Sequence, residues 1–297
     1  MGELDDIVAQ LEPVLGALEG EPQPLAGGIT NRNFRARFGG SDYMIRRHGK
    51  DTGLLGIDRE AERMASEAAA HLEIAPEVVA ALPDGLVARF VSCRQASAEE
   101  IAGRVSEIAL ALRSFHDSGL QLPVRFWVPD LLSDYARIAA ERGAALPRAY
   151  ATAVAVGSRI AEAMPLSLPQ PCHDDLLPGN IIRAHDGGRI MIVDWEYAGM
   201  GHPYFDLGNL SVNNGFDEAT DDSLLSAYHG GGAPSDVQRA RLKLMRLLSD
   251  AREGAWAVVQ SGISELDFDF EAYGEEHFGR LLAAAGDPEL EEWLASA

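Results

Sequence analysis

Four side chains near the middle of the chain have the types and the spacing that phosphoryl transfer requires. His173 and Asp175 are followed by Asn180, and Asp194 comes fourteen residues after Asn180. Phosphoryl transfer needs one carboxylate beside the attacking hydroxyl and oxygen ligands that hold Mg²⁺ on the phosphates, and an H-x-D-x4-N pattern with a later Asp supplies both. We therefore expect Asp175 on a catalytic loop, with Asn180 and Asp194 as magnesium ligands.

Two other interpretations of this segment are open from the residues alone. His173, Asp174 and Asp175 are also the residue types of an ordinary solvated turn. His173 with Asp174 would also begin a metal-dependent hydrolase site of the HD type. The sequence lacks the further His and Asp ligands at helical spacing that such a site needs, which disfavours the hydrolase.

Two signals nearer the N-terminus fit the binding of nucleotide phosphates. In the turn over residues 27–34, backbone N–H groups and the side chains of Thr30 and Asn31 are suited to cradle phosphates, although the turn matches neither GxGxxG nor GK[ST]. Arg46 on an expected strand and Glu62 on an expected helix offer a cation–carboxylate pair like the Lys–Glu pair of kinases. Taken singly, the first signal is equally well a plain β-turn and the second a cation on a surface strand.

The elements that must position these residues fall into two groups. Before residue 97 we expect a helix over 1–20, a hairpin over 29–38 and 43–46, a helix over 59–72 and a hairpin over 78–91. After it we expect helices, interrupted by two short apolar segments at 180–183 and 190–193. This order predicts an α+β protein of two lobes, residues 1–93 and 94–297, with a ligand cleft between them.

Composition and charge exclude several classes of protein. The 297 residues carry 25 Lys and Arg against 46 Asp and Glu, a formal net charge of −21, so non-specific affinity for nucleic acid is not expected. No apolar run is long enough to span a membrane, the first residues do not resemble a signal peptide, and the two cysteines fit neither a disulfide framework nor a zinc site. We expect a cytoplasmic protein without nucleic-acid or membrane partners, whose acidic field suits a cationic small molecule.

In this order, the signals resemble the aminoglycoside phosphotransferase and choline kinase superfamily, whose members have a bilobal protein-kinase-like fold. The similarity is greatest to choline/ethanolamine kinases, especially the bacterial ones. Residues 27–34 resemble their phosphate loop, 45–49 their phosphate-binding strand, 192–209 their metal-Asp segment and 256–264 their W-S-I-V-Q-A-x-I-S stretch. These four motifs extend over nearly the whole chain.

The resemblance implies a role for each matched position. Asp175 would orient the substrate hydroxyl or accept its proton, Asn180 and Asp194 would bind Mg²⁺, and His173 and Asp206 would support the catalytic loop. ATP would contact a larger set of residues, which comprises Gly28, Thr30, Asn31, Arg46 with its helix partner Glu62, and the backbone of Arg89, Phe90 and Val91.

The acceptor pocket that the resemblance implies departs from the family pattern at one position. Glu196, Trp256 and Tyr273 match residues that line the choline pocket, but Glu253 stands where those kinases have a second cage tryptophan. Recognition of a quaternary ammonium relies on aromatic faces and nearby carboxylates. An anion in place of one aromatic wall favours an amine that donates hydrogen bonds. The alternative is that Trp256 is a core aromatic and Glu253 a solvated helix residue.

The sequence predicts an ATP- and Mg²⁺-dependent kinase that phosphorylates the hydroxyl of an amino alcohol such as choline or ethanolamine. The alternative acceptor is an aminoglycoside or another hydroxylated amine. A non-catalytic kinase-like nucleotide-binding protein is the other function considered, and the intact set of Asp175, Asn180 and Asp194 argues against it. A protein kinase is disfavoured because DFG and APE motifs are missing and Asp206 follows too soon for an activation loop. We expect a monomer or a homodimer.

Overall fold

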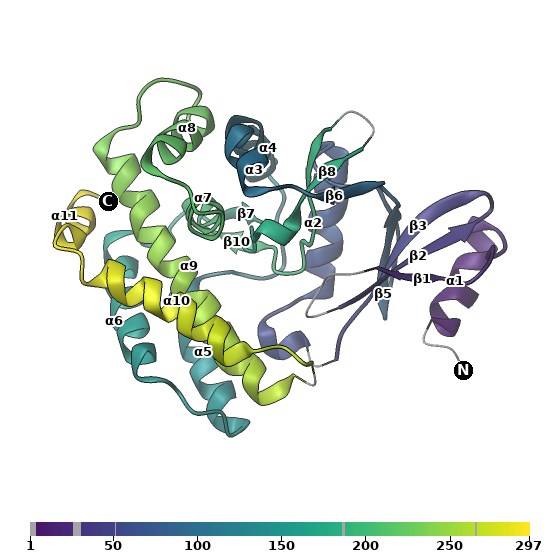
Figure 1. The fold of residues 1–297 in the computed structure, drawn as a ribbon, viewed down its shortest axis with the longest axis horizontal. Coiled ribbons are helices and arrows are strands. Elements are labelled where there is room, and N and C mark those ends of the chain that lie inside the picture. Colours follow the sequence, from purple (N-terminus) through teal and green to yellow (C-terminus); the bar gives the residue numbers. More distant parts are fainter. Residues whose placement is uncertain (1–3, 26–30, 51, 186–187, 265) are drawn as a thin grey trace.

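The computed structural model describes residues 4–25, 31–50, 52–185, 188–264 and 266–297. Its N-terminal region contains a β-sheet and its C-terminal region is mostly helical, and Figure 1 shows the two regions next to each other. This confirms the predicted α+β class and the order of its two parts. The lobe boundary after residue 93 stays a prediction, although the chain leaves the first sheet after Arg89 and enters a separate small sheet at Cys93.

An antiparallel sheet of five strands forms the N-terminal region. In the order in which they pair, the strands are β1 (Gln23–Leu25), β2 (Arg32–Phe38), β3 (Ser41–Arg47), β5 (Gly85–Arg89) and β4 (Val78–Leu82). Gly39 and Gly40 connect β2 to β3 with φ angles of 52° and 79°, which suit a two-residue hairpin turn and which glycine adopts without steric cost. Within the described residues, both predicted hairpins are confirmed.

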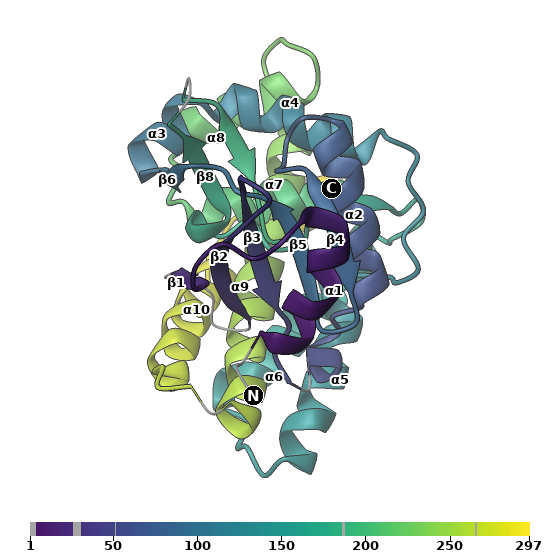
Figure 2. The same ribbon diagram turned by 90° about the vertical axis from the view of Figure 1, so that its right-hand side faces the viewer.

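Helix α1 (Asp5–Leu15) covers the outer face of this sheet (Figure 2). Ile7 and Leu11, one helical turn apart, pack with Phe38 and other strand residues into a small apolar core. The helix is shorter than the predicted 1–20 because Gly16 follows it with a φ of 92°, which is not a helical angle.

Helix α2 (Arg59–His71) follows the short 3₁₀ helix η1 (Thr52–Leu55) and confirms the helix predicted over 59–72. The Asp58 side chain caps it by accepting a hydrogen bond from the backbone N–H of Ala61 at 2.8 Å. The alanines that recur every fourth residue on one face of α2 belong to the same apolar core as the C-terminal helices; they are Ala61, Ala65 and Ala69. Their small side chains let α2 lie close against the helical region.

Hydrogen bonds on both sides of α2 fix it to the helical region. Before the helix, the Tyr135 hydroxyl donates to the carbonyl oxygen of Leu55 at 2.8 Å. After the helix, the backbone N–H of Ile192 donates to the carbonyl oxygen of Ile74 at 2.8 Å. Because both flanks are held, Glu62 in the first turn of α2 has a fixed position relative to the C-terminal region.

Two small sheets hold the segments expected to carry the chemistry. One pairs β6 (Cys93–Gln95), β8 (Ile181–Ala184) and β9 (Ile190–Ile192), and the other pairs β7 (Gln170–Cys172) with β10 (Gly199–Gly201). Strands β8 and β9 confirm the two short apolar segments. Strands β6, β7 and β10 were not predicted, because each has only three residues, too few to show an alternating pattern, and β7 contains Pro171 while β10 contains two glycines. Residues 173–180 and 193–198 therefore start and end at paired strand ends.

Helices make up most of the rest of the chain, together with the 3₁₀ turn η2 (Pro178–Asn180). They are α3 (Ala98–Gly103), α4 (Val105–His116), α5 (Val128–Glu141), α6 (Arg148–Ala163), α7 (Pro203–Asn213), α8 (Glu218–Tyr228), α9 (Asp236–Ile263), α10 (Phe270–Ala285) and α11 (Leu290–Ser296). Helix α9 packs against α5, α6, α7, α8, α10 and α11 (Figure 1). Among the described helices, none is both long and apolar enough to cross a membrane.

The close crossing of α7 and α9 gives a test of the packing. A Cβ on Gly208 of α7 would lie 2.6 Å from the carbonyl carbon of Met245 on α9. We expect Gly208→Ala to force the helices apart and to lower the free energy of unfolding by about 1–3 kcal/mol. The measurement is denaturant unfolding followed by circular dichroism. Gly279→Ala is the matched control, because open space surrounds that position in α10, and it should leave stability unchanged or raise it by ~0.5–1 kcal/mol. Equal effects of the two variants would contradict the packing.

Candidate active site

A cavity of about 580 Å³ lies between the sheet region and the helical region. Its volume suits a small-molecule ligand. It is lined by many of the residues that the sequence singled out, which are Asn31, Phe90, Val91, Asp175, Asn180, Asp194, Glu196, Glu253, Trp256 and Tyr273. Residues far apart in the sequence therefore meet at one place, as the two-lobed prediction requires.

Five of the residues expected to contact a nucleotide are not among those that line the cavity, and Arg46 and Glu62 are two of them. Gly28 and Thr30 lie outside the described residues. The side chain of Arg89 is directed elsewhere, because it lies over the Tyr43 ring and pairs with Glu77. The backbone N–H groups of Arg89 and Phe90 already donate to carbonyl oxygens within the N-terminal region. Among the three positions 89–91, only Phe90 and Val91 line the cavity.

The Asp206 side chain, on α7, holds the segment that begins with His173. Its two carboxylate oxygens accept the backbone N–H groups of His173 and Asp174, each at 2.8 Å. Burial acts to raise the pKa of Asp206, but its interactions with His116 and the backbone hydrogen bond from His173 outweigh burial and lower the pKa. Asp206 is therefore an ionised anchor for this loop.

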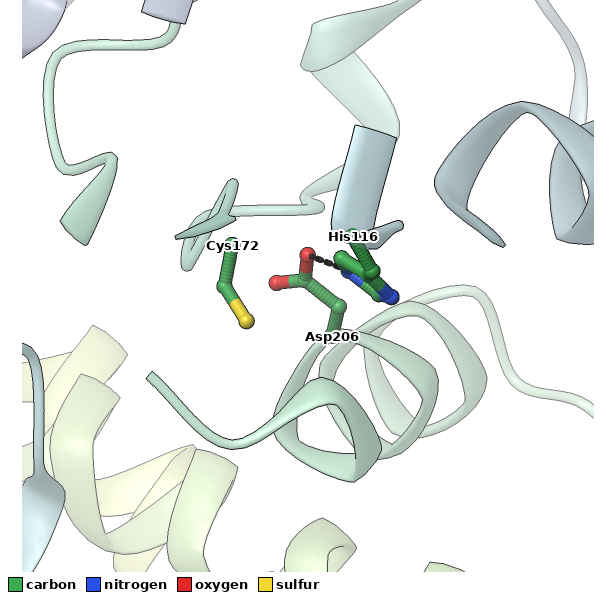
Figure 3. Close-up of side chains that lie close together, drawn as sticks. All are labelled: His116, Cys172 and Asp206. Atoms are coloured by element: carbon green, nitrogen blue, oxygen red, sulfur yellow. Dashed lines mark hydrogen bonds and ion pairs between the residues drawn. The ribbon is translucent and has the colours of Figure 1, made fainter. Parts of the chain in front are cut away.

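His116 and Cys172 lie against the Asp206 carboxylate in the protein interior (Figure 3). The three groups are close enough to hold a metal ion, but their hydrogen bonds favour a structural role. His116 bonds to Asp206 at 2.9 Å through Nε2 and to the Tyr228 hydroxyl at 2.8 Å through Nδ1. Burial raises the pKa of the Cys172 thiol well above its ordinary value, so this sulfur stays protonated.

His173 braces the loop from within. Its Nδ1 accepts the backbone N–H of Asp175 at 3.2 Å, and its Nε2 is 3.0 Å from the carbonyl oxygen of Val193, to which it donates. Burial lowers the pKa of His173, which keeps the ring in this neutral form. Both ring nitrogens are therefore engaged with backbone groups on the two segments that carry Asp175 and Asp194.

Asn180 and Asp175 are joined directly. The Asn180 side-chain nitrogen donates to the carbonyl oxygen of Asp175 at 2.7 Å and to its Oδ2 at 3.0 Å. This leaves the side-chain oxygen of Asn180 as the atom available for a cation. Asp194 lies beside it, because the backbone N–H of Val193 donates to the carbonyl oxygen of Asn180 at 2.9 Å. An amide oxygen next to a carboxylate is a donor set that Mg²⁺ accepts.

Arg46 links the sheet to Asp194. Its Nη1 lies 2.5 Å from Asp194 Oδ1 and 3.2 Å from Glu62 Oε1, so the predicted Arg46–Glu62 pair is formed. Burial acts to lower the pKa of Arg46, but the charges of Asp194 and Glu62 raise it further, and the side chain stays cationic. Arg59, which the sequence analysis did not single out, bonds to Glu62 at 2.7 Å and to Glu196 at 3.2 Å. Its position three residues before Glu62 on a helix was the available signal.

Glu196 bonds to the N-terminal region through one of its carboxylate oxygens. Its Oε2 accepts a hydrogen bond of 2.8 Å from the side chain of Asn31 as well as the bond from Arg59. Burial and the neighbouring charge of Asp194 raise the pKa of Glu196 to about 7. Although Glu196 lines the cavity, its contacts tie the segment after Asp194 to the turn that contains Asn31.

Glu253 is buried rather than solvated, which corrects that alternative from the sequence. Its Oε1 accepts from Arg252 at 2.7 Å and its Oε2 accepts from the Tyr273 hydroxyl at 2.9 Å. Trp256 is buried as well, packs edge-on against Tyr273 and donates to the Tyr197 hydroxyl at 2.8 Å. Trp256 is thus part of the core and of the cavity wall at once.

Asp174 is a buried acid with little to stabilise its charge. It has a φ of 66°, and neither carboxylate oxygen has a hydrogen bond of good geometry within the described part of the chain. Burial and the charge of Asp206 raise its pKa well above the ordinary value, and the charge of Arg252 and a backbone contact with Gly199 offset this only in part. Burial in the folded protein therefore favours the protonated form of Asp174.

This burial gives a test with a defined sign. Between the unfolded pKa of about 3.9 and the higher folded pKa, folding takes up a proton at Asp174. The free energy of unfolding therefore falls as the pH rises through that window. We expect Asp174→Asn, which tolerates the same φ, to raise the free energy of unfolding by at least ~1 kcal/mol at pH 8 and by less at pH 5. Thermal and urea unfolding at both pH values measure this.

The matched control for this test is Glu218→Gln, whose side chain is 92% exposed. It should change stability by less than ~0.5 kcal/mol at either pH. A stability difference between Asp174→Asn and the unmodified protein that stays constant or narrows from pH 5 to pH 8 would contradict the protonated state of Asp174.

Comparisons with known proteins agree with this geometry. The model of the phosphotransferase enzyme family (APH) matches residues 21–243. The crystal structure of a choline/ethanolamine kinase family protein from Mesorhizobium loti is 31% identical, with a TM-score of 0.81 and 98% coverage of both chains. The choline kinase LicA from Streptococcus pneumoniae is 22% identical with a TM-score of 0.77 over 96% of this chain and 99% of that one, and a LicA structure has been solved in complex with AMP.

A curated relative extends the same pattern. The probable choline kinase 2 of Arabidopsis thaliana is 24% identical over 95% of this chain and 92% of its own length. The fold is therefore the predicted kinase-like one. The chain belongs to the phosphotransferase enzyme family and, like its choline and ethanolamine kinase relatives, it is a small-molecule kinase whose acceptor is an alcohol.

Proposed function

We propose that the protein uses ATP and Mg²⁺ to phosphorylate the hydroxyl of a small amino alcohol. One observation carries the proposal: a single cavity is lined by the Asp175 carboxylate, by the oxygen ligands Asn180 and Asp194, and by the buried anion Glu253. These groups supply what the reaction requires, namely a site for the attacking hydroxyl, a site for the cation on the phosphates and an anchor for an amine.

The nucleotide fits on the side of the cavity next to the sheet. Phe90, Val91 and Ile182 give an apolar wall for a purine base. Arg46 contacts one of the proposed metal ligands, because its present partner is Asp194. Mg²⁺ bound by Asp194 and Asn180 would neutralise charge on the phosphates. Arg46 would then be free to pair with the phosphate oxygens in place of Asp194.

Asp175 has the surroundings of a group that receives a proton. Burial raises its pKa, although the positive charge of Arg252 acts in the opposite direction. The hydrogen bond from Asn180 and the ion pair with Arg252 fix both of its oxygens. A hydroxyl bound at Asp175 would be oriented for attack and would pass its proton to this carboxylate.

The acceptor pocket favours an amine that carries N–H groups. Trp256 and Tyr273 supply aromatic surface, while Glu253 supplies carboxylate oxygens that accept hydrogen bonds. A quaternary ammonium has no N–H to add to the bonds that Glu253 accepts from Arg252 and Tyr273. We therefore place primary and secondary amino alcohols before choline.

The panel of acceptors that tests this proposal contains ethanolamine, its mono- and dimethylated forms, choline, an aminoglycoside and an aminosugar. We expect turnover with the primary or secondary amines and a kcat/KM for choline lower by at least ~10-fold, because choline cannot donate to Glu253. The measurement is ADP release with Mg·ATP, and Asp175→Asn is the blank. A preference for choline would contradict the role of Glu253. An absence of turnover with every acceptor, despite ATP binding, would contradict the proposed function.

The proposed metal site is tested separately through Asp194. We expect Asp194→Asn to lower kcat by at least ~100-fold and to raise the Mg²⁺ concentration needed for half-maximal rate, because a charged ligand is lost. The measurement is a Mg²⁺ titration of ADP release with one active acceptor. Asp222→Asn is the control, because it removes a carboxylate that pairs with Arg239 and does not line the cavity. Its rate should depend on Mg²⁺ concentration as that of the unmodified protein does. Normal Mg²⁺ dependence of Asp194→Asn would rule this ligand out.

A further inference from the structure

Arg252 is a residue of the cavity that the sequence analysis did not single out. It lies on α9, lines the cavity and has a side chain that is only 1% exposed. Its Nη1 donates to Asp175 Oδ1 at 2.9 Å and to Glu253 Oε1 at 2.7 Å. A single nitrogen atom thus joins the carboxylate at the proposed hydroxyl site to the carboxylate at the proposed amine site.

The guanidinium group is held in this position by an aromatic ring. Its Cζ lies 4.2 Å from the centroid of the Tyr197 ring, a cation–π distance. The Tyr197 hydroxyl in turn accepts the indole N–H of Trp256. Within the described residues, Nε and Nη2 of Arg252 have no hydrogen-bond partner. The two carboxylates and the ring face therefore determine where Arg252 lies.

We propose that Arg252 is a positioning residue that holds Asp175 and Glu253 at a fixed separation, so that the hydroxyl and the amine of the acceptor are set by one rigid unit. This rests on the proposed function. Without Arg252, two buried carboxylates would face each other with no cation between them and would repel. The Asp175 carboxylate would then turn away from the position in which it meets the acceptor.

The bridge also limits the distance between the two carboxylates. Because both oxygens bond to Arg252 Nη1, the distance between Asp175 Oδ1 and Glu253 Oε1 cannot exceed the sum of the two hydrogen-bond lengths. Two carboxylates at this separation can both contact one small acceptor, with its hydroxyl at Asp175 and its amine at Glu253.

Arg252→Met tests the bridge, because methionine fills a similar volume without charge. We expect kcat for the best acceptor to fall on the order of 100-fold, as a displaced carboxylate no longer meets the hydroxyl, while the Kd for ATP changes less than ~3-fold. Arg252→Lys, which keeps the charge on a shorter side chain, should recover part of kcat. Arg246→Met is the control on the same helix: it loses an ion pair with Asp221 outside the cavity and should keep kcat.

A second variant separates positioning from a general structural role. Adding Glu253→Gln to Arg252→Met removes the repulsion, so kcat should rise above that of Arg252→Met alone while KM for the acceptor increases. If Arg252 had only a structural role, kcat would show no such recovery, and the fold losses in kcat of the two substitutions would multiply. The proposal would be overturned by losses in kcat that multiply in the double variant. It would also be overturned if kcat of Arg252→Met were within roughly 2-fold of that of the unmodified enzyme.

A crystal structure of Arg252→Met provides a readout that needs no acceptor. The Asp175 side chain should adopt a different rotamer from that in the Arg246→Met crystal, and an unmoved Asp175 would overturn the proposal. If the unmodified enzyme phosphorylates none of the acceptors, the proposed function fails, and this comparison still decides whether Arg252 positions Asp175.

Discussion

The centre of the molecule depends on the compensation of buried carboxylates by a few arginines. Glu62, Asp194 and Glu196 meet Arg46 and Arg59 between the sheet and the helical region. A second group, Asp175 with Glu253, meets Arg252. Buried charges are tolerated when they are paired and hydrogen-bonded, and each unpaired one is costly. The two regions must therefore come together in this register for the charges to be compensated.

The loop that carries Asp175 is held from behind by a second, independent set of bonds. Asp206 binds its backbone, and His116 binds Asp206 from α4. His173 closes the set by joining the loop to the segment before Asp194. Because these partners come from α4, α7 and a short hairpin, the loop geometry is a property of the whole helical region.

The sequence was sufficient for the elements and motifs whose signal is local. The hairpins, helix α2 and the segment from His173 to Asp206 have periodicity or spacing that can be read directly. Strands β7 and β10 could not be predicted, since three residues with proline or glycine carry no pattern. Arg252 could not be assigned either, because its partner Asp175 is 77 residues away in the chain and only the packing of α9 brings the two together. The same long-range contacts showed Glu253 to be buried.

The anchoring of α2 bears on how such an enzyme is controlled. In protein kinases, regulation often acts by moving the helix that carries the glutamate partner of the phosphate-binding cation. Here the alanine face of α2 is buried in the core of the helical region, and the carbonyl groups of Leu55 and Ile74 are bonded to that region on either side of the helix. Displacing α2 would open the core itself. A change in the position of Glu62 relative to Arg46 is therefore coupled to the packing of the whole helical region.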